Sequence, residues 1–198
     1  MTIDRLKKQI DFIFEIDKLK QVYRQTLLMD GSRKENDAEH SWHLSVMSIL
    51  LNEYALGKNI DIHRIVKMLL IHDIVEIDAG DTYCYDEKLS QDKLEREQVA
   101  ADRLFSLLPP DQEEEFRKLW EEFEERVTPE ARFAAALDRF QPLLHNYKTK
   151  GMSWEEHGIT SEKVVERNKK TIIEGSTILW DYAEELIRNS IEKGYLSQ

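Results

Sequence analysis

An adjacent histidine and aspartate, His72 and Asp73, lie inside the apolar run MLLIHDIVEI. Aspartate is rarely buried without a partner that offsets the cost of removing its charge from water, and a metal ion is one such partner. A structural interpretation is equally open at this point: a core histidine bonded to a backbone carbonyl, beside an aspartate that caps a helix or joins an ion pair. The pair therefore suggests metal-dependent chemistry without deciding it.

Further candidate ligands lie in two other apolar segments. His40 and His43 share the inward stripe of one expected helix, and Asp138 lies within AAALDRFQPLL. Two imidazoles and two carboxylates from three helices can converge in a bundle core, which is a known way to build a metal site. The spacing does not choose between His40 and His43, and Asp138 could instead pair with Arg132 or Arg139. This ligand set suits Mn, Fe, Co, Ni or Zn, with Mg less favoured by nitrogen donors.

Helical periodicity dominates the segments that must position these residues, and only 7 glycines and 4 prolines interrupt the chain. We expect helices over residues 3–28 with a break near Asp17, 36–57, 61–77, 92–108, 111–127, from Thr128 onward, and 161–193. No segment alternates cleanly with a period of two, so we predict no β-sheet. The pattern predicts an all-α protein.

Capping residues support several of these helix boundaries. Asn36 and Glu39 have the spacing of a capping-box variant, and Asp61 is expected to cap the following helix. Thr128 followed by Pro129 is typical of a helix start. The inward stripe of the helix that begins near Asn36 is expected to contain His40, His43, Met47, Leu50 and Tyr54.

Composition narrows the class of partner. The 198 residues are enough for one domain with a sizeable core. The net charge of −11 disfavours long nucleic acids, whereas local arginines and a metal would still accept a small phosphorylated substrate.

A single cysteine, Cys84, excludes an internal disulfide and fits a reducing cytoplasm. No signal-peptide pattern or membrane-spanning run is recognisable, so we expect a cytoplasmic protein without a membrane partner.

The pattern His40…His72-Asp73…Asp138 resembles the H…HD…D signature of the HD-domain superfamily of metal-dependent phosphohydrolases. Its surroundings, ENDAEHS at 35–41, HDIVEIDAGD at 72–81 and ALDRFQPLL at 136–144, are similar to bacterial HD hydrolases related to 5′-deoxynucleotidases. The resemblance implies a single-domain HD-type helical bundle over residues 1–198, with the metal-site core at about 36–148. It also implies one divalent metal held by His40, His72, Asp73 and Asp138, because the family places its first ligand in the EHS tripeptide.

Two other branches of the superfamily fit less well. Two-metal HD phosphodiesterases carry extra histidines between the HD pair and the last aspartate, and no histidine lies between Asp73 and Asp138. The (p)ppGpp pyrophosphohydrolases carry a Glu-Asp pair shortly after the HD pair, where this chain has Glu76-Ile77. The resemblance therefore favours a single-metal enzyme of the deoxynucleotidase-like branch.

That branch has a glutamate and a Gly-Asp pair at the positions of Glu76 and Gly80-Asp81. The resemblance implies that Glu76, one helical turn from His72, positions or deprotonates the attacking water, and that Asp81 assists the leaving alkoxide. On the residues alone, Glu76 could be a solvated acid at a helix end, and Asp81 could be only a turn residue.

The same resemblance assigns phosphate binding to Arg24 through its planar guanidinium. Gln25 follows it where the related nucleotidases have a tryptophan that contacts the sugar, so the choice between ribose and deoxyribose stays open. The other candidate substrate contacts are Arg33, Trp42, His43, Asp81 and Thr82.

The function implied is hydrolysis of phosphomonoesters, above all nucleoside 5′-monophosphates. The alternatives are an HD hydrolase of a non-nucleotide phosphate ester or of a diphosphate, and a non-catalytic regulatory module that contains a metal. The family resemblance also suggests a homodimer. Apolar residues in the segment 161–193 would either pack on the core or form the dimer interface: Ile172, Ile173, Leu179, Trp180, Ala183 and Ile187.

Overall fold

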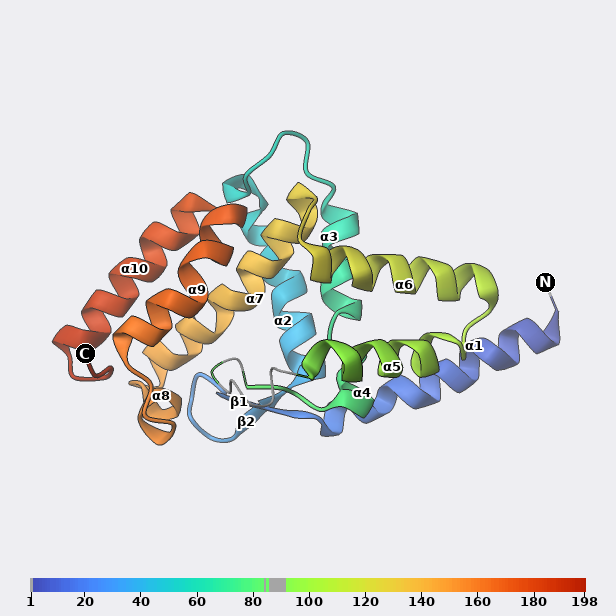
Figure 1. Cartoon of the computed structure of the whole chain (residues 1–198), viewed down its shortest axis with the longest axis horizontal. Coiled ribbons are helices and arrows are strands. Elements are labelled where there is room, and N and C mark those ends of the chain that lie inside the picture. The colour runs from blue at the N-terminus through green and yellow to red at the C-terminus, as the bar shows by residue number, and fades with distance from the viewer. Residues whose placement is uncertain (1, 84, 86–91) are drawn as a thin grey trace.

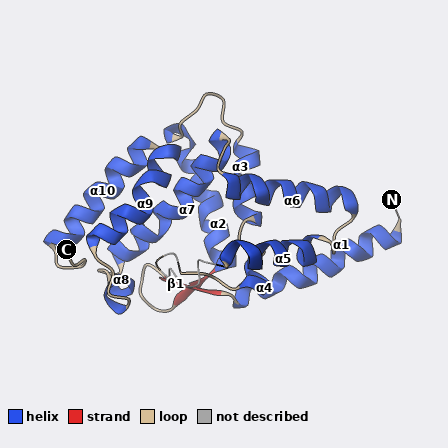
Figure 2. Cartoon of the chain, in the orientation of Figure 1, coloured by secondary structure: helices blue, strands red, loops and turns tan. Residues whose placement is uncertain are grey.

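The computed structural model describes residues 2–83, 85 and 92–198. Its elements are α1 (Ile3–Ile16), η1 (Asp17–Gln21), β1 (Tyr23–Leu27), β2 (Lys34–Asn36), α2 (Asp37–Leu51), η2 (Asn52–Tyr54), α3 (Ile62–Ile71), α4 (Glu76–Ala79), α5 (Lys93–Phe105), α6 (Pro110–Glu125), α7 (Pro129–Lys148), α8 (Met152–Glu156), α9 (Ser161–Gly175) and α10 (Thr177–Glu192). Figure 2 shows that helices make up nearly all of the regular structure, which confirms the predicted all-α class. Cys84 and most of the predicted loop 82–91 lie outside the described residues.

Helix α7 runs through the middle of the fold and packs against α2, α3, α6, α9 and α10 (Figure 1). Small residues let the neighbouring helices approach it closely, since four of its alanines are buried. At the end of α9, a Cβ atom on Gly175 would lie 2.4 Å from the backbone oxygen of Arg132 in α7. Because no side chain fits in that space, Gly175 allows direct contact between the two helices. The alanine-rich AAALD segment is therefore a packing surface that carries Asp138.

A short hairpin corrects the prediction that the chain contains no β-sheet. Strands β1 and β2 pair antiparallel, with Tyr23 opposite Asn36 and Leu27 opposite Lys34. The alternating pattern is missing because the hairpin buries polar groups: Thr26 in β1, and Glu35 and Asn36 in β2, are all buried. A strand whose polar side chains face a site does not show the apolar alternation of a strand that faces a core. The N-terminal helix ends at Ile16, at the break predicted near Asp17, but η1 and β1 replace the helix predicted from there to residue 28.

The helix predicted over 61–77 is interrupted at the HD pair. Helix α3 ends at Ile71, and α4 begins only at Glu76. Between them the backbone tightens into i→i+3 hydrogen bonds, from the amide of Ile74 to the carbonyl of Ile71 and from that of Glu76 to that of Asp73, both 3.0 Å long. Such tightened turns often mark functional positions within helices.

The C-terminal segment predicted as one helix consists of two. Helix α9 ends at Gly175, and the Ser176 side chain caps α10 by accepting a hydrogen bond from the backbone amide of Leu179. The predicted apolar residues pack on the core of the same chain: Ile172, Leu179, Trp180, Ala183 and Ile187 are buried, and Ile173 packs partly buried against them. This observation favours the first of the two alternatives for the segment.

The predicted inward stripe of α2 was partly wrong. His40 and Met47 are buried, but Leu50 is 67% exposed and Tyr54 is 37% exposed. The buried face instead continues from His40 through Leu44 and Ser48, in steps of four residues. The helix therefore turns His40 inward and leaves His43 only half-buried.

The predicted caps are confirmed. Asn36 and Glu39 form a reciprocal capping box at the start of α2. The side chains of Asp61 and Thr128 accept hydrogen bonds from backbone amides at the starts of α3 and α7. Among the described residues, no helix is both long enough and apolar enough to cross a membrane.

Candidate metal centre and active-site cleft

Four predicted ligands meet where α2, the end of α3 and α7 converge. One donor atom from each of His40, His72 and Asp73 lies within 4.8 Å of the others, and all three residues are buried. Asp138 joins them from α7, with Oδ1 3.1 Å from Nε2 of His40. The structure therefore brings together the residues that spacing and resemblance singled out. It also places His40, and not His43, at this centre.

His72 is held in the form that a metal ligand needs. Its Nδ1 lies 2.9 Å from the carbonyl oxygen of Leu69 and must donate a proton to it. Its Nε2 therefore carries the lone pair, and this atom is buried with no hydrogen-bond partner among the described residues. Burial lowers the pKa of His72, which keeps the ring neutral. A buried imidazole lone pair directed at carboxylates fits a divalent cation.

His40 lies between two carboxylates. Its Nε2 contacts Asp138, and its Nδ1 lies 3.4 Å from Oε2 of Glu35. Burial and Arg24 oppose protonation of this ring, but the hydrogen bond to Asp138 and the contact with Glu35 prevail and raise the pKa of His40 to about 9. Burial also opposes ionisation of Asp138, yet the bond to His40 and nearby Arg139 hold the pKa of Asp138 well below its usual range.

A buried polar chain holds Glu35 in place. Its Oε1 accepts a hydrogen bond of 2.7 Å from the side-chain amide of Gln141, which also lies 2.9 Å from Nε2 of His145. His145 Nδ1 in turn lies 2.8 Å from the carbonyl oxygen of Leu27 in β1. A carboxylate that faces the outer nitrogen of a ligating histidine fixes its tautomer and its orientation. The chain thus links the hairpin to His40.

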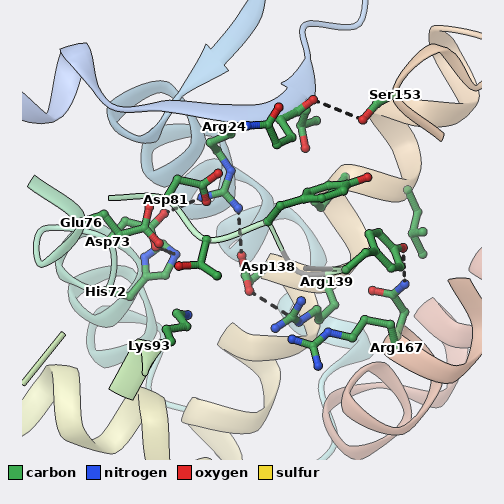
Figure 3. A pocket seen from close by; sticks show the side chains of 18 of the residues that line it. Arg24, His72, Asp73, Glu76, Asp81, Lys93, Asp138, Arg139, Ser153 and Arg167 are labelled. Atoms are coloured by element: carbon green, nitrogen blue, oxygen red, sulfur yellow. Dashed lines mark hydrogen bonds and ion pairs between the residues drawn. The ribbon is translucent and has the colours of Figure 1, made fainter. Parts of the chain in front are cut away.

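Arg24 extends from β1 across the centre (Figure 3). Its Nη1 lies 3.1 Å from Oδ1 of Asp37 and 2.9 Å from Oδ2 of Asp73, and its Nη2 lies 3.8 Å from Oδ1 of Asp138. Burial opposes its charge, but Asp73, Asp81 and Asp37 together hold the pKa of Arg24 well above its usual value. The guanidinium is therefore a fixed positive group directly beside the candidate ligands.

The two predicted catalytic acids lie at the same centre. Glu76 is only 5% exposed, so it is not a solvated acid at a helix end. Burial and the charges of Asp73 and Asp37 raise its pKa well above the usual range. Burial likewise raises the pKa of Asp81, and burial with Asp73 raises that of Asp37 to about 7. Acids with raised pKa values in a cleft are suited to proton transfer near neutral pH.

A cleft that encloses about 980 Å³ of empty space, part of it open to solvent, is lined by Arg24, His72, Asp73, Glu76, Asp81 and Asp138. Of the predicted substrate contacts, Arg24, Gln25, Asp81 and Thr82 line it. Further along, its wall contains the aromatic side chains of Tyr83, Tyr85 and Trp154 and the polar ones of Asn146, Ser153 and Asn168. Phe123 also lines the cleft but packs on His72, with ring centroids 4.7 Å apart. The cleft therefore combines a charged end with a mixed aromatic and polar end.

Three predicted substrate contacts are not brought to the cleft. Arg33 is bound to Glu39, with Nη2 2.6 Å from Oε1. Trp42 is 64% exposed on the outer face of α2. His43 faces Gln141 instead, and its Nδ1 lies 3.3 Å from the side-chain nitrogen of Gln141.

Several residues of the site were missed by the sequence reasoning. Glu35 and Asp37 flank the cap residue Asn36, so the available signal was an acidic residue on either side of an expected helix cap. Gln141 and His145 follow Asp138 on the same face of α7 at steps of three and four residues, so helical spacing from the proposed ligand could have found them.

The HD-domain family model matches residues 16–180. The chain therefore belongs to the HD-domain family. It is 31% identical over 136 residues to the 5′-deoxynucleotidase HDDC2 of Bos taurus, covering 68% of this chain and 64% of that protein. It is 25% identical over 193 residues to the 5′-deoxynucleotidase hdd1 of Schizosaccharomyces pombe, covering 95% of this chain and 86% of that protein. The chain thus spans slightly less than two thirds of the bovine relative.

Solved structures agree with this placement. A predicted metal-dependent phosphohydrolase from Magnetospirillum magnetotacticum superposes with a TM-score of 0.93 at 55% identity, covering 98% of this chain and 96% of that one. A conserved hypothetical protein from Pyrococcus furiosus, 23% identical, superposes with a TM-score of 0.63 over 90% of this chain and 99% of that one. The second match shows the fold alone, and the first extends the similarity over almost the whole chain.

Proposed function

We propose that this protein is a metal-dependent phosphohydrolase that removes the 5′-phosphate from nucleoside monophosphates. The observation that carries the proposal is the convergence of His40, His72, Asp73 and Asp138 beside the guanidinium of Arg24. The relatives named 5′-deoxynucleotidases support the nucleotide as substrate.

The four converging residues are the proposed ligands of one divalent cation. Asp37, Asp73 and Glu76 form a second group whose donor atoms lie close enough to hold an ion. Arg24 already lies between Asp37 and Asp73 at hydrogen-bond distance from both. Its fixed charge offsets theirs, which supports one metal rather than two. Two imidazoles and two carboxylates favour Mn, Fe, Co, Ni or Zn over Mg.

A divalent cation at this centre would supply Lewis acidity and lower the pKa of water. Arg24 donates to the phosphate oxygens and stabilises the charge that develops on them. Glu76 accepts the proton of the attacking water as the P–O bond to the leaving group breaks. Asp81, whose pKa is raised by burial, donates a proton to the departing O5′. The products are a nucleoside and inorganic phosphate.

The nucleoside would occupy the mixed end of the cleft. Tyr83, Tyr85 and Trp154 line the cleft there, and aromatic side chains are common partners of nucleobases. Gln25 lines the cleft, but its side-chain oxygen accepts a hydrogen bond of 2.6 Å from Nζ of Lys34. The Gln25 oxygen is therefore already engaged, so we expect little discrimination at the sugar by this residue.

A substrate panel tests the function. With added Mn or Co, the purified protein should release phosphate from ribo- and deoxyribonucleoside 5′-monophosphates, and chelation with EDTA should abolish turnover until metal is restored. The measurement is phosphate release, with metal content followed by elemental analysis. Turnover of sugar phosphates or inorganic diphosphate in place of every nucleotide would contradict the proposal and favour a non-nucleotide substrate.

We also propose that the protein forms a homodimer through a groove between α1, α2 and α3. The groove is lined by apolar residues that include Ile13, Ala38 and Leu70, and Ile13 is 53% exposed. We expect the native chain to sediment as a dimer and Ile13→Glu as a monomer. Replacing Ile178, which is 53% exposed on α10, with glutamate is the matched control and should leave the dimer intact. A monomeric native chain would refute this interface.

A cytoplasmic location also stays a prediction, based on the single cysteine.

A further inference from the structure

Three arginines gather at one wall of the cleft, apart from Arg24. Arg126 follows the end of α6, Arg139 extends from α7, and Arg167 extends from α9; all three line the cleft. Figure 3 shows the side chains of Arg139 and Arg167 next to each other in this view, on the far side of Asp138 from Arg24. Elements far apart in the sequence therefore place three positive side chains around one part of the cleft.

Asp138 and Glu124 act against the repulsion that Arg126 meets from Arg139 and Arg167. Nε of Arg139 lies 3.9 Å from Oδ2 of Asp138, which also serves His40 through its other oxygen. Nε of Arg126 is buried without a hydrogen-bond partner among the described residues. Burial and the neighbouring charges of Arg139 and Arg167 lower the pKa of Arg126. Positive side chains that are buried close together repel one another. A bound anion would offset that repulsion.

The scissile phosphate does not account for these arginines. In the proposed reaction that group already faces Arg24 and the metal ligands. The chain as a whole carries a net charge of −11, so a cluster of arginines in its cleft is not a consequence of a generally basic surface. A second anionic group on the same substrate would use them.

We propose that Arg126, Arg139 and Arg167 form a second phosphate subsite, and that the preferred substrates are nucleoside 3′,5′-bisphosphates. This inference rests on the proposed function and names its substrate class. Water attacks the 5′-phosphorus, the P–O5′ bond breaks and O5′ takes up a proton. The products are inorganic phosphate and a nucleoside 3′-monophosphate, whose remaining phosphate stays on the arginines.

The position of Asp138 favours a second phosphate attached to the sugar over one attached directly to the 5′-phosphate. Its Oδ1 faces the metal centre, and its Oδ2 faces Arg139. The two sites are thus adjacent but separated by a carboxylate, which repels a continuous diphosphate. A pentose places its 3′- and 5′-phosphates apart and carries no charge between them.

The kinetic test compares deoxyadenosine 5′-monophosphate, deoxyadenosine 5′-diphosphate and deoxyadenosine 3′,5′-bisphosphate. For the native enzyme we expect kcat/KM to be at least about tenfold higher with the bisphosphate, since a charge-assisted contact is worth roughly that factor. Arg167→Gln and Arg126→Gln should each remove most of that preference. Arg188→Gln, which removes the same charge from the exposed face of α10, is the matched control and should retain it. Equal kcat/KM values for monophosphate and bisphosphate, or a preference for the diphosphate, would overturn the subsite.

A binding test separates this inference from the proposed function. Deoxyadenosine 3′-monophosphate should bind to the EDTA-treated protein, and Arg167→Gln should weaken its Kd about tenfold in calorimetry. If the native enzyme hydrolyses the 5′-monophosphate but its metal-free form does not bind the 3′-monophosphate, the subsite is refuted and the function stands. If the 3′-monophosphate binds but no nucleotide is hydrolysed, the function is refuted and the subsite stands.

Discussion

Replacing Asp73 with asparagine should remove the metal and, with it, nearly all activity. Asp73 contacts three other residues of the centre. Its carboxylate oxygens lie 3.1 Å from His72, 3.9 Å from His40 and 2.9 Å from Arg24. The amide keeps the shape of the side chain but loses the charge that draws a cation to this buried position. Loss of a supporting residue around a metal commonly costs roughly 10–100-fold in metal affinity, so we expect loss of a ligand to exceed about 100-fold.

The measurements are metal content after gel filtration and phosphate release from a nucleoside 5′-monophosphate. Asp78→Asn is the matched control, because Asp78 lies five residues further along, is exposed, and is bound to Arg103 outside the cleft. The control should retain both metal and turnover. If Asp73→Asn retained stoichiometric metal with native affinity, Asp73 would not be a ligand.

The site illustrates what helical spacing can predict. The acids and imidazoles in apolar surroundings predicted a buried centre because an uncompensated charge there is costly. Spacing alone left His40 and His43 equivalent, since both lie within one turn of the inward face of α2. The structure separates them: His40 is fully buried at the centre, whereas His43 lies beside Gln141. Which of two such residues faces the centre depends on how the helix is placed and rotated, and this depends on all the elements that pack against it.

The parts that the sequence did not reveal depend on contacts between distant segments. The β1–β2 hairpin has no apolar alternation, because it supplies polar groups such as Arg24 and Glu35 to the centre. Arg126 and Arg167 are separated by 41 positions in the sequence and meet only because α6 and α9 both pack on α7. No local pattern marks either arginine as part of a cleft. Functional clusters of this kind become visible only once the packing is known.

Replacing Glu76 with glutamine should abolish most turnover while leaving the metal in place. Glu76 lies one helical turn after His72, within reach of the centre, but it is not one of the four proposed ligands. Burial and its acidic neighbours raise the pKa of Glu76, so a neutral amide of the same shape should not destabilise the fold. Glutamine cannot accept the proton of the attacking water, and loss of a general base typically costs about 10²–10⁴-fold in kcat.

The informative comparison is kcat against metal content for Glu76→Gln, with Glu95→Gln on the exposed face of α5 as the control. We expect the Glu76 variant to bind metal and nucleotide with near-native affinity and to differ in kcat alone. Loss of metal from this variant would make Glu76 a ligand, and a kcat within tenfold of native would assign the proton transfer to another acid. Asp37 would then be the next candidate, because one of its carboxyl oxygens lies within 4.8 Å of one of Glu76 and its pKa is raised to about 7. If the protein were instead a non-catalytic module, the native chain would show no turnover. Its metal would be retained in every variant that keeps the four ligands.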